Sequence, residues 1–456
     1  MKIRHAKLMF FILILPLTLY FAFEKQPHQK PYMSKSEGQS NSPLLSIQQW
    51  KSSNGAKIFF VPVEGLAIVD IQVDFNAGSA RDGSKPGLAA LCLSLLNEGT
   101  TDLNADQIAT IFEDNGAIYS PGVVRDRIGL SLRSLSDPTV LDPVIELFSN
   151  VIAKPSFPEK NIEAQRNETL IALKRNLQDP HKIAEEAFLK AIYQEHPYAH
   201  LVYGTEAGVN SIQKSDLQQF HQQYFVANNA TITLVGNMSV QNAKNIAEKI
   251  TGKLKSGHQA PLLPTVSPLI ENHIHHIPYP TEQAHIMMGQ PCAIENDPDF
   301  FPLLVGNNIL GAPFTSRLFK EIRNKRGLVY SVYSNVLEWL RPAPFVIGLQ
   351  TKNEQSAEAI KVVQETLTQF IKDGPNEDEL TEVKRSIVGR FPQTVNSNAN
   401  IKDIVANIAF YNLPLNYLNT YQANVNAVTR EEIKNVFKRR IHPEKMALIV
   451  VAEKQP

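Results

Sequence analysis

The sequence has little of several things, and each shortage excludes a class of protein. Only two of its 456 residues are cysteines, Cys92 and Cys292, so a disulfide framework is excluded, although their spacing leaves open whether they pair. Lys plus Arg and Asp plus Glu both number 45, so the chain has no basic surplus and we expect no nucleic-acid partner. With 43% hydrophobic and 20% charged residues, the chain suits a globular protein of two or more domains.

The N-terminus carries an apolar run, residues 8–23, that follows Lys2, Arg4 and Lys7. A basic start and an apolar segment are typical of an export signal. Roughly 16 residues is short for a membrane span. Because no small-residue cleavage motif follows, residues 1–23 fit either a cleaved signal peptide or an uncleaved inner-membrane anchor. In both cases we expect export, to the periplasm or to a membrane-anchored position facing it, with residues 24–43 as a flexible tether.

The body of the chain repeats its own layout. A helix followed by a strand is predicted at 215–236 and again at 430–451. We infer two related domains, 44–251 and 273–456, joined by a linker at 252–272 that holds several Pro, Gly and Ser residues. Strands and long amphipathic helices predict an α+β fold, in which each domain is a sheet with helices packed on one face. Residues 68–75 alternate apolar and polar, which predicts a half-buried strand.

Within residues 87–100, residues 88–96 are predicted to form an apolar helix, which two glycines, Gly87 and Gly99, flank. Ala90, Leu93 and Ser94 share one face of it, because 90 and 94 are one turn apart. Two histidines and a carboxylate in these places could hold zinc and take a proton from its bound water. Alanine and leucine offer no lone pair, and a serine hydroxyl is a poor zinc ligand. The segment therefore indicates a buried core helix.

This helix resembles the zinc-site helix of the insulinase/pitrilysin peptidase family, which has His-x-x-Glu-His at these positions. Residues 163–180 resemble the family's Glu-rich helix; the match places the third zinc ligand on Ala172 and a supporting Glu on Gln165. The resemblance spans nearly all of residues 45–452. It implies two homologous mixed-sheet-plus-helices domains, as in a clamshell half of the mitochondrial-processing-peptidase type, with the zinc site lost.

A second segment of this chain matches the family's pattern without loss of its functional residues. Residues 314–334 are similar to the family's substrate-clamping segment, and the match places its Arg and Tyr on Arg323 and Tyr330. A guanidinium can hold a peptide carbonyl or carboxylate with two parallel bonds, and a phenol can donate to an oxyanion. The alternative interpretation is a solvated basic helix end. His273 and His275 share a strand face, but without acidic or cysteine partners they indicate a polar strand start rather than a metal site.

Three functions are compatible with these residues. The resemblance favours a non-catalytic subunit that binds peptide and completes the active site of a zinc-bearing family partner, since some family enzymes are heterodimers of this kind. We then expect no catalytic residue or cofactor in this chain alone, no proteolysis by it alone, and zinc only in the partner. The second is a zinc-less structural or peptide-binding scaffold. The third is an active zinc metalloendopeptidase with unrecognised ligands.

Overall fold

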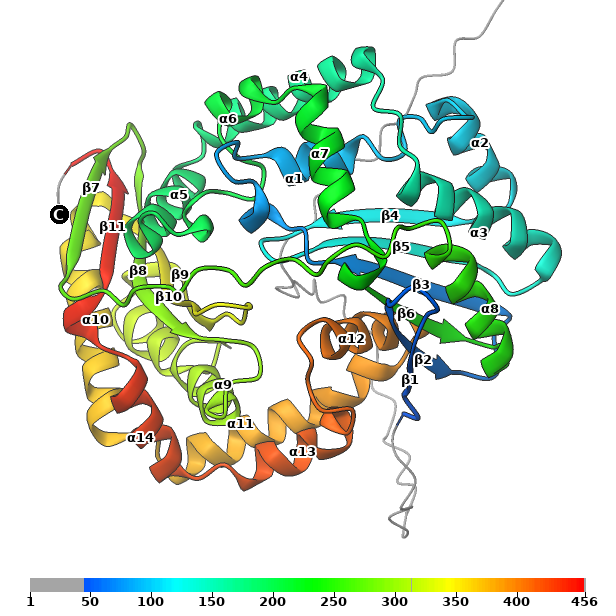
Figure 1. The fold of residues 1–456 in the computed structure, drawn as a ribbon. Coiled ribbons are helices and arrows are strands. Elements are labelled where there is room, and N and C mark those ends of the chain that lie inside the picture. The colour runs from blue at the N-terminus through cyan, green and yellow to red at the C-terminus, as the bar shows by residue number, and fades with distance from the viewer. Residues whose placement is uncertain (1–44, 313, 455–456) are drawn as a thin grey trace, which may run out of the picture. The chain divides into compact units, whose positions relative to one another are not determined.

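The computed structural model describes residues 45–312 and 314–454. The predicted signal or anchor segment, 1–23, and the predicted tether, 24–43, lie outside the described residues. Two β-sheets with their helices make up the described part (Figure 1). No helix of this part is both long and apolar enough to cross a bilayer.

The first sheet has six strands in the order β1-β2-β6-β3-β5-β4. The strands are β1 (Gln48–Lys51), β2 (Lys57–Pro62), β3 (Ile68–Phe75), β4 (Ile118–Val123), β5 (Ile128–Leu135) and β6 (Ala230–Gly236). β6 is parallel to β2, and the other neighbouring pairs are antiparallel.

The second sheet repeats the topology of the first. Its order is β7-β11-β8-β10-β9, with β11 parallel to β7 and the other pairs antiparallel. The strands are β7 (His273–Pro278), β8 (Gln283–Ala293), β9 (Val329–Val336), β10 (Ala343–Lys352) and β11 (Ala447–Ala452). This matches β2-β6-β3-β5-β4 strand for strand, with β1 as an addition. The predicted α+β fold with two related halves is therefore confirmed.

The helices are divided between the two halves of the chain. Those of the first half are α1 (Leu88–Ser94), α2 (Ala105–Asp114), α3 (Pro138–Ala153), α4 (Glu159–Asn176), α5 (Pro180–Tyr193), α6 (Glu206–Ser211), α7 (Lys214–Tyr224) and α8 (Val240–Thr251). Those of the second half are α9 (Phe300–Leu310), α10 (Ser356–Asp373), α11 (Glu377–Arg390), α12 (Asn398–Phe410), α13 (Tyr417–Ala427) and α14 (Arg430–Arg440). Capping boxes at Asn104, Asn376 and Thr429 begin α2, α11 and α14.

The connection between the halves has no regular structure but is fixed to the body. Residues 255–270 contain no helix or strand. Leu263 and Leu269 are nevertheless buried. The carbonyl of Leu263 accepts a hydrogen bond from Nε of Arg341 at 2.8 Å, and that of Pro264 accepts one from Nε2 of His196 at 3.1 Å.

The prediction that residues 68–75 form a half-buried strand is wrong. Both aspartates of β3 are buried, Asp70 at 2% exposure and Asp74 at 0%. Asp70 accepts two hydrogen bonds from Arg133, at 2.8 and 3.1 Å. Lys402 of α12 donates to Oγ of Ser131 on the neighbouring strand at 2.7 Å. The polar face is buried because its charges are paired and a helix from the other half covers it, which alternation within one strand does not reveal.

One helix from each half packs on the sheet of the other half. The prediction that helices cover only one face of each sheet is therefore also wrong. α12 packs on β2, β3 and β6, and α5 packs on β8 and β11 (Figure 1). The α12 contact is a hydrophobic cluster that joins Val405 and Ala409 to Phe59 and Val235. The α5 contact is a cluster that includes Phe188, Ile192, Met287 and Ile449. Both sheets are therefore covered on two faces.

A carboxyl pair joins Glu295, which follows β8, to Glu338 in the loop between β9 and β10. The side chains of Glu295 and Glu338 are hydrogen-bonded to each other. The backbone N–H of Glu295 donates to the carbonyl of Trp339 at 2.9 Å, which ties the pair to the same loop. Burial, and then the charge of the neighbouring carboxylate, raise the pKa of Glu338 from 4.5 to about 9. The pair therefore shares a proton at neutral pH.

This pair predicts a pH dependence of stability. A carboxyl whose folded pKa is raised stabilises the fold fully below its unfolded pKa, near 4.5, and this contribution is lost as the pH rises toward 9. We expect the free energy of unfolding to fall across this range, and Glu338→Gln to reduce that fall by at least about 1 kcal/mol. Urea unfolding at a series of pH values measures it. Glu354→Gln, an exposed glutamate, is the control; equal pH slopes for Glu338→Gln and the wild type would contradict the assignment.

Candidate functional site

The helix α1 is held at its N-terminus by a buried carboxylate. Asp82, 3% exposed, accepts hydrogen bonds from the backbone N–H groups of Gly87 and Ala89, both at 2.7 Å. Burial raises the pKa of Asp82 to about 8 in spite of these bonds. Gly87 has a positive φ of 105°, and an added Cβ would lie 2.9 Å from the carbonyl oxygen of Tyr203, so glycine is required there.

The three predicted site positions on α1 carry no metal ligand. Ala90 is 8% exposed and Leu93 is 5% exposed, and both pack in the first half. The hydroxyl of Ser94 donates to the carbonyl of Leu91 at 3.0 Å, within its own helix. The residues between them, Leu91 and Cys92, are buried, as expected for the core helix that the sequence predicts.

The second zinc-site helix of the family corresponds to α4, which packs against α1. Arg166 anchors it, because its buried guanidinium donates to the carbonyls of Val209 and Ile212, the second at 2.9 Å. Ala172 lies on the exposed part of the helix, beside Ile171, which is 54% exposed. The structure thus brings the two helices together. Within residues 45–312 and 314–454, no group of three or more His, Cys, Asp or Glu could hold a metal ion.

The two cysteines and the histidines His273 and His275 were the other residues considered as metal ligands. The described structure contains both cysteines as free, buried thiols, and burial raises the pKa of Cys292 to about 12. His273 and His275 lie on β7, an edge strand of the second sheet.

Arg323 and Tyr330 lie in the second half, on a π-helical turn η4 (Phe319–Asn324) and near the start of β9. Ile322, fully buried, fixes the turn to the core, and its carbonyl accepts from the backbone N–H of Leu328 at 3.1 Å. Gly327 has a φ of 65°, which lets the chain turn from η4 into β9. The turn leaves Arg323 and Tyr330 exposed, Tyr330 at 72%.

The polar groups of these two side chains have no protein partner in the described part of the chain. Lys325 and Arg326 both pair with Glu321, at 2.6 and 3.0 Å, whereas Arg323 makes no ion pair there. Its guanidinium lies over the ring of Phe319, 4.8 Å from the centroid, and its N–H donors stay available. The hydroxyl of Tyr330 likewise makes no hydrogen bond to a described residue. Phe319 was not among the predicted site residues, although its spacing of four residues from Arg323 is a signal for contact on a helix.

Comparison with known proteins shows the family to which the chain belongs. A family model described as insulinase, peptidase family M16, matches residues 64–206, and one described as peptidase M16 inactive domain matches residues 211–387. The crystal structure of a peptidase M16 inactive domain from Pseudomonas fluorescens is 34% identical, with a TM-score of 0.87 over 90% of this chain and 99% of that one. The sequence is 26% identical to the non-peptidase homolog YmxG of Helicobacter pylori, over 83% of this chain and 88% of that protein. It is 24% identical to an uncharacterized zinc protease, YmxG of Bacillus subtilis, over 75% and 83%.

The chain belongs to the insulinase family, peptidase family M16. It is a non-peptidase homologue within that family, and the assignment of the family's zinc-site positions to Ala90, Leu93, Ser94 and Ala172 stays a prediction from the sequence.

The replaced ligands predict that the purified chain holds no stoichiometric zinc. No side chain at the four positions can replace imidazole or carboxylate as a ligand. Metal analysis after dialysis against dilute zinc is the measurement, with a His-x-x-Glu-His relative as the positive control. About one tightly held zinc per chain would contradict the site assignment.

Restoring only the two histidines should not restore hydrolysis. In Ala90→His with Ser94→His, the positions of the general base and the third ligand remain Leu93 and Ala172. An imidazole left unpaired at the buried position 90 should also lower the free energy of unfolding by about 1–3 kcal/mol. Peptide cleavage by this double variant would show that the site is misplaced.

Proposed function

We propose that this chain is an exported, non-catalytic subunit that binds peptide and completes the active site of a zinc-bearing M16 partner. One observation carries the proposal. Arg323 and Tyr330 are exposed with unpaired polar groups, in a chain whose own zinc-site positions cannot hold a metal. Neither side chain is needed to satisfy a buried group of the described fold.

The chemistry of the two side chains suits a peptide. A guanidinium presents a fixed fork of donors that fits a carbonyl or a carboxylate, and stacking on Phe319 leaves the edge of that fork open. A phenol can donate a hydrogen bond to the negative oxygen that forms when an amide carbonyl is attacked. The residues at this chain's own zinc positions do not fit a metal, so the metal and its bound water belong to the partner in this proposal.

Export rests on the sequence of residues 1–23, and it places the complex in the periplasm or on the membrane facing it. The partner is expected to be a His-x-x-Glu-His relative, and a neighbouring gene that encodes one would favour this proposal over the scaffold alternative. Affinity purification of the tagged full-length chain from the native envelope, followed by identification of stoichiometric companions, tests both points. Recovery of the chain alone from the envelope would favour the scaffold alternative.

Tyr330→Phe tests the oxyanion donor. The change removes one hydroxyl and little volume from a side chain that is 72% exposed, so folding and pairing should not change. We expect the turnover of the reconstituted complex to fall about ten- to a thousand-fold, with KM nearly unchanged. Cleavage is measured beside complex formation by size-exclusion chromatography. Full activity in an assembled complex would leave Tyr330 without a catalytic role.

Arg323→Ala should weaken peptide binding as well as turnover, because the guanidinium holds the substrate before and during the reaction. Arg323→Lys is the matched control, since it keeps the charge and loses the planar fork. We expect lysine to recover part of the affinity but not the full rate. Cleavage unchanged in both variants, in complexes that still form, would assign this chain to a scaffold role.

A further inference from the structure

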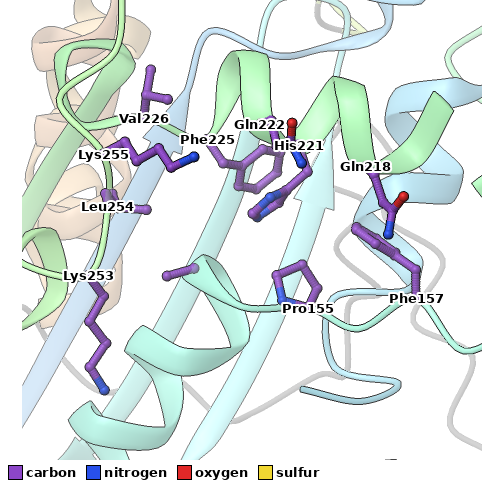
Figure 2. Close-up of a pocket in the computed structure, with 11 residues that line it drawn as sticks. Pro155, Phe157, Gln218, His221, Gln222, Phe225, Val226, Lys253, Leu254 and Lys255 are labelled. Carbon is purple, nitrogen blue, oxygen red and sulfur yellow. The ribbon is translucent and has the colours of Figure 1, made fainter. Parts of the chain in front are cut away.

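A pocket of about 270 Å³ lies in the first half of the chain, beside α7, which packs against α1. None of the predicted zinc-site positions lines it, and neither Arg323 nor Tyr330 does. It is built by α7, by the segment 153–157 and by the segment 253–255, which follows α8 (Figure 2). The size is near the lower limit for small-molecule sites, about 300 Å³, so a ligand must be small.

The floor of the pocket consists of rings. His221 stacks on Phe225, with 4.7 Å between centroids, and meets Phe157 edge-on at 6.0 Å. Nε2 of His221 donates to the carbonyl of Ile152 at 2.7 Å, which fixes the ring. Burial lowers the pKa of His221 to about 4, so at neutral pH the ring is uncharged and extends the apolar floor.

Phe157 occupies its place at a conformational cost. It has a φ of +48°, in the left-handed region that bulky residues avoid, and its side chain is 1% exposed. Such strain persists only where the surroundings determine it, and strained residues cluster at functional sites. Here the strained residue contributes to the ring floor of the pocket.

The rim of the pocket is polar and positively charged. Figure 2 shows the ammonium end of Lys255 turned toward the ring of Phe225. That ammonium has no ion-pair or hydrogen-bond partner in the described part of the chain, whereas Lys253 is engaged by Glu146 and by Asn150 at 2.8 Å. The carboxamides of Gln218 and Gln222 complete the rim, and no described residue that lines the pocket is acidic.

We propose that this pocket binds a small amphipathic carboxylate, with its apolar body on the His221–Phe225 floor and its carboxylate paired with Lys255. The assignment follows from charge complementarity, because a flat apolar floor beside one unpaired cation fits an aromatic or branched acid. The carbonyl of Lys255 also accepts from the backbone N–H of Ala227 at 2.8 Å. A bound acid would therefore fix the beginning of the connection between the two halves.

The test uses 3-phenylpropionate as the probe and the whole chain, by isothermal titration calorimetry at pH 7. We expect a Kd on the order of 0.1 to 1 mM. The uncharged 3-phenylpropanamide and the cationic 3-phenylpropylamine should bind at least about ten-fold more weakly. Binding should also slow hydrogen exchange in residues 252–257. Equal affinities for the three probes, or no binding at about 10 mM, would overturn the proposal.

Variants assign the binding to the pocket. Lys255→Gln, at an exposed position, should weaken the acid at least about five-fold and leave the amide unchanged, whereas Lys372→Gln on α10, also exposed, should change neither. Gln222→Trp should fill the mouth and abolish binding of the acid, with thermal unfolding as a check of the fold. Wild-type affinity in Lys255→Gln or in a folded Gln222→Trp overturns the assignment.

An apolar body with a carboxylate occurs both in a free acid and in the C-terminal residue of a peptide. N-acetylphenylalanine and its amide distinguish the two sources. Tighter binding of N-acetylphenylalanine than of 3-phenylpropionate supports a peptide C-terminus as the ligand, and weaker binding supports a free acid.

Discussion

The buried carboxylate of Asp126 joins the two halves of the chain. It is 1% exposed and accepts hydrogen bonds from the hydroxyl of Tyr198, from the backbone N–H of Leu340 at 2.8 Å and from the hydroxyl of Tyr411 at 3.4 Å. The first donor comes from the first half, the second from the β9–β10 loop, and the third from the end of α12. A buried carboxylate that lost these donors would cost about 1–3 kcal/mol for each unmade bond, so the three segments are held in one arrangement. The exchange of α5 and α12 depends on this arrangement, because each helix must reach the sheet of the other half.

The exchanged helices also explain the polar face of the first sheet. Asp70 and Asp74 on β3 would face water if the first half stood alone, since no helix of that half covers them. The aspartates pair with Arg133 and Arg127 of the first half itself, whereas α12 brings an apolar stripe that buries this face, and its Lys402 donates to Ser131 of β5. Each half has a hydrophobic core of its own residues, but one face of each sheet is covered by a helix that lies far away in the sequence.

This dependence separates what the sequence could predict from what it could not. The period of two in β3 and the repeated helix-then-strand layout were sufficient for the strands, the fold class and the two related halves. The covering of both sheet faces was not predictable, because Phe188 and Val405 look like ordinary core residues of their own helices. In the candidate site, the apolar spacing was sufficient to place Ala90, Leu93 and Ser94 on a buried helix. It gave no indication that Tyr330 is exposed. The ring floor of the pocket was not predictable either. It brings His221 of α7 against Phe157, whose positive φ no local sequence pattern indicates.

The two parts of the candidate site, the helix α1 and the Arg323–Tyr330 segment, contribute differently to the stability of the fold. The helix α1 is held by the carboxylate of Asp82 and by apolar residues such as Leu91 and Leu95, none of which is a family zinc ligand. A helix held in this way does not rely on bound metal for its position, unlike small domains whose folding energy is metal binding, and this agrees with the prediction of Ala and Leu at the ligand positions. Arg323 and Tyr330 contribute little to stability for the converse reason, because they are exposed and their polar groups are unpaired within the described structure. Packing accounts for the residues at the predicted zinc positions, whereas the guanidinium of Arg323 and the phenol of Tyr330 lie outside the packed core, and the proposed contact with another molecule rests on these two exposed groups.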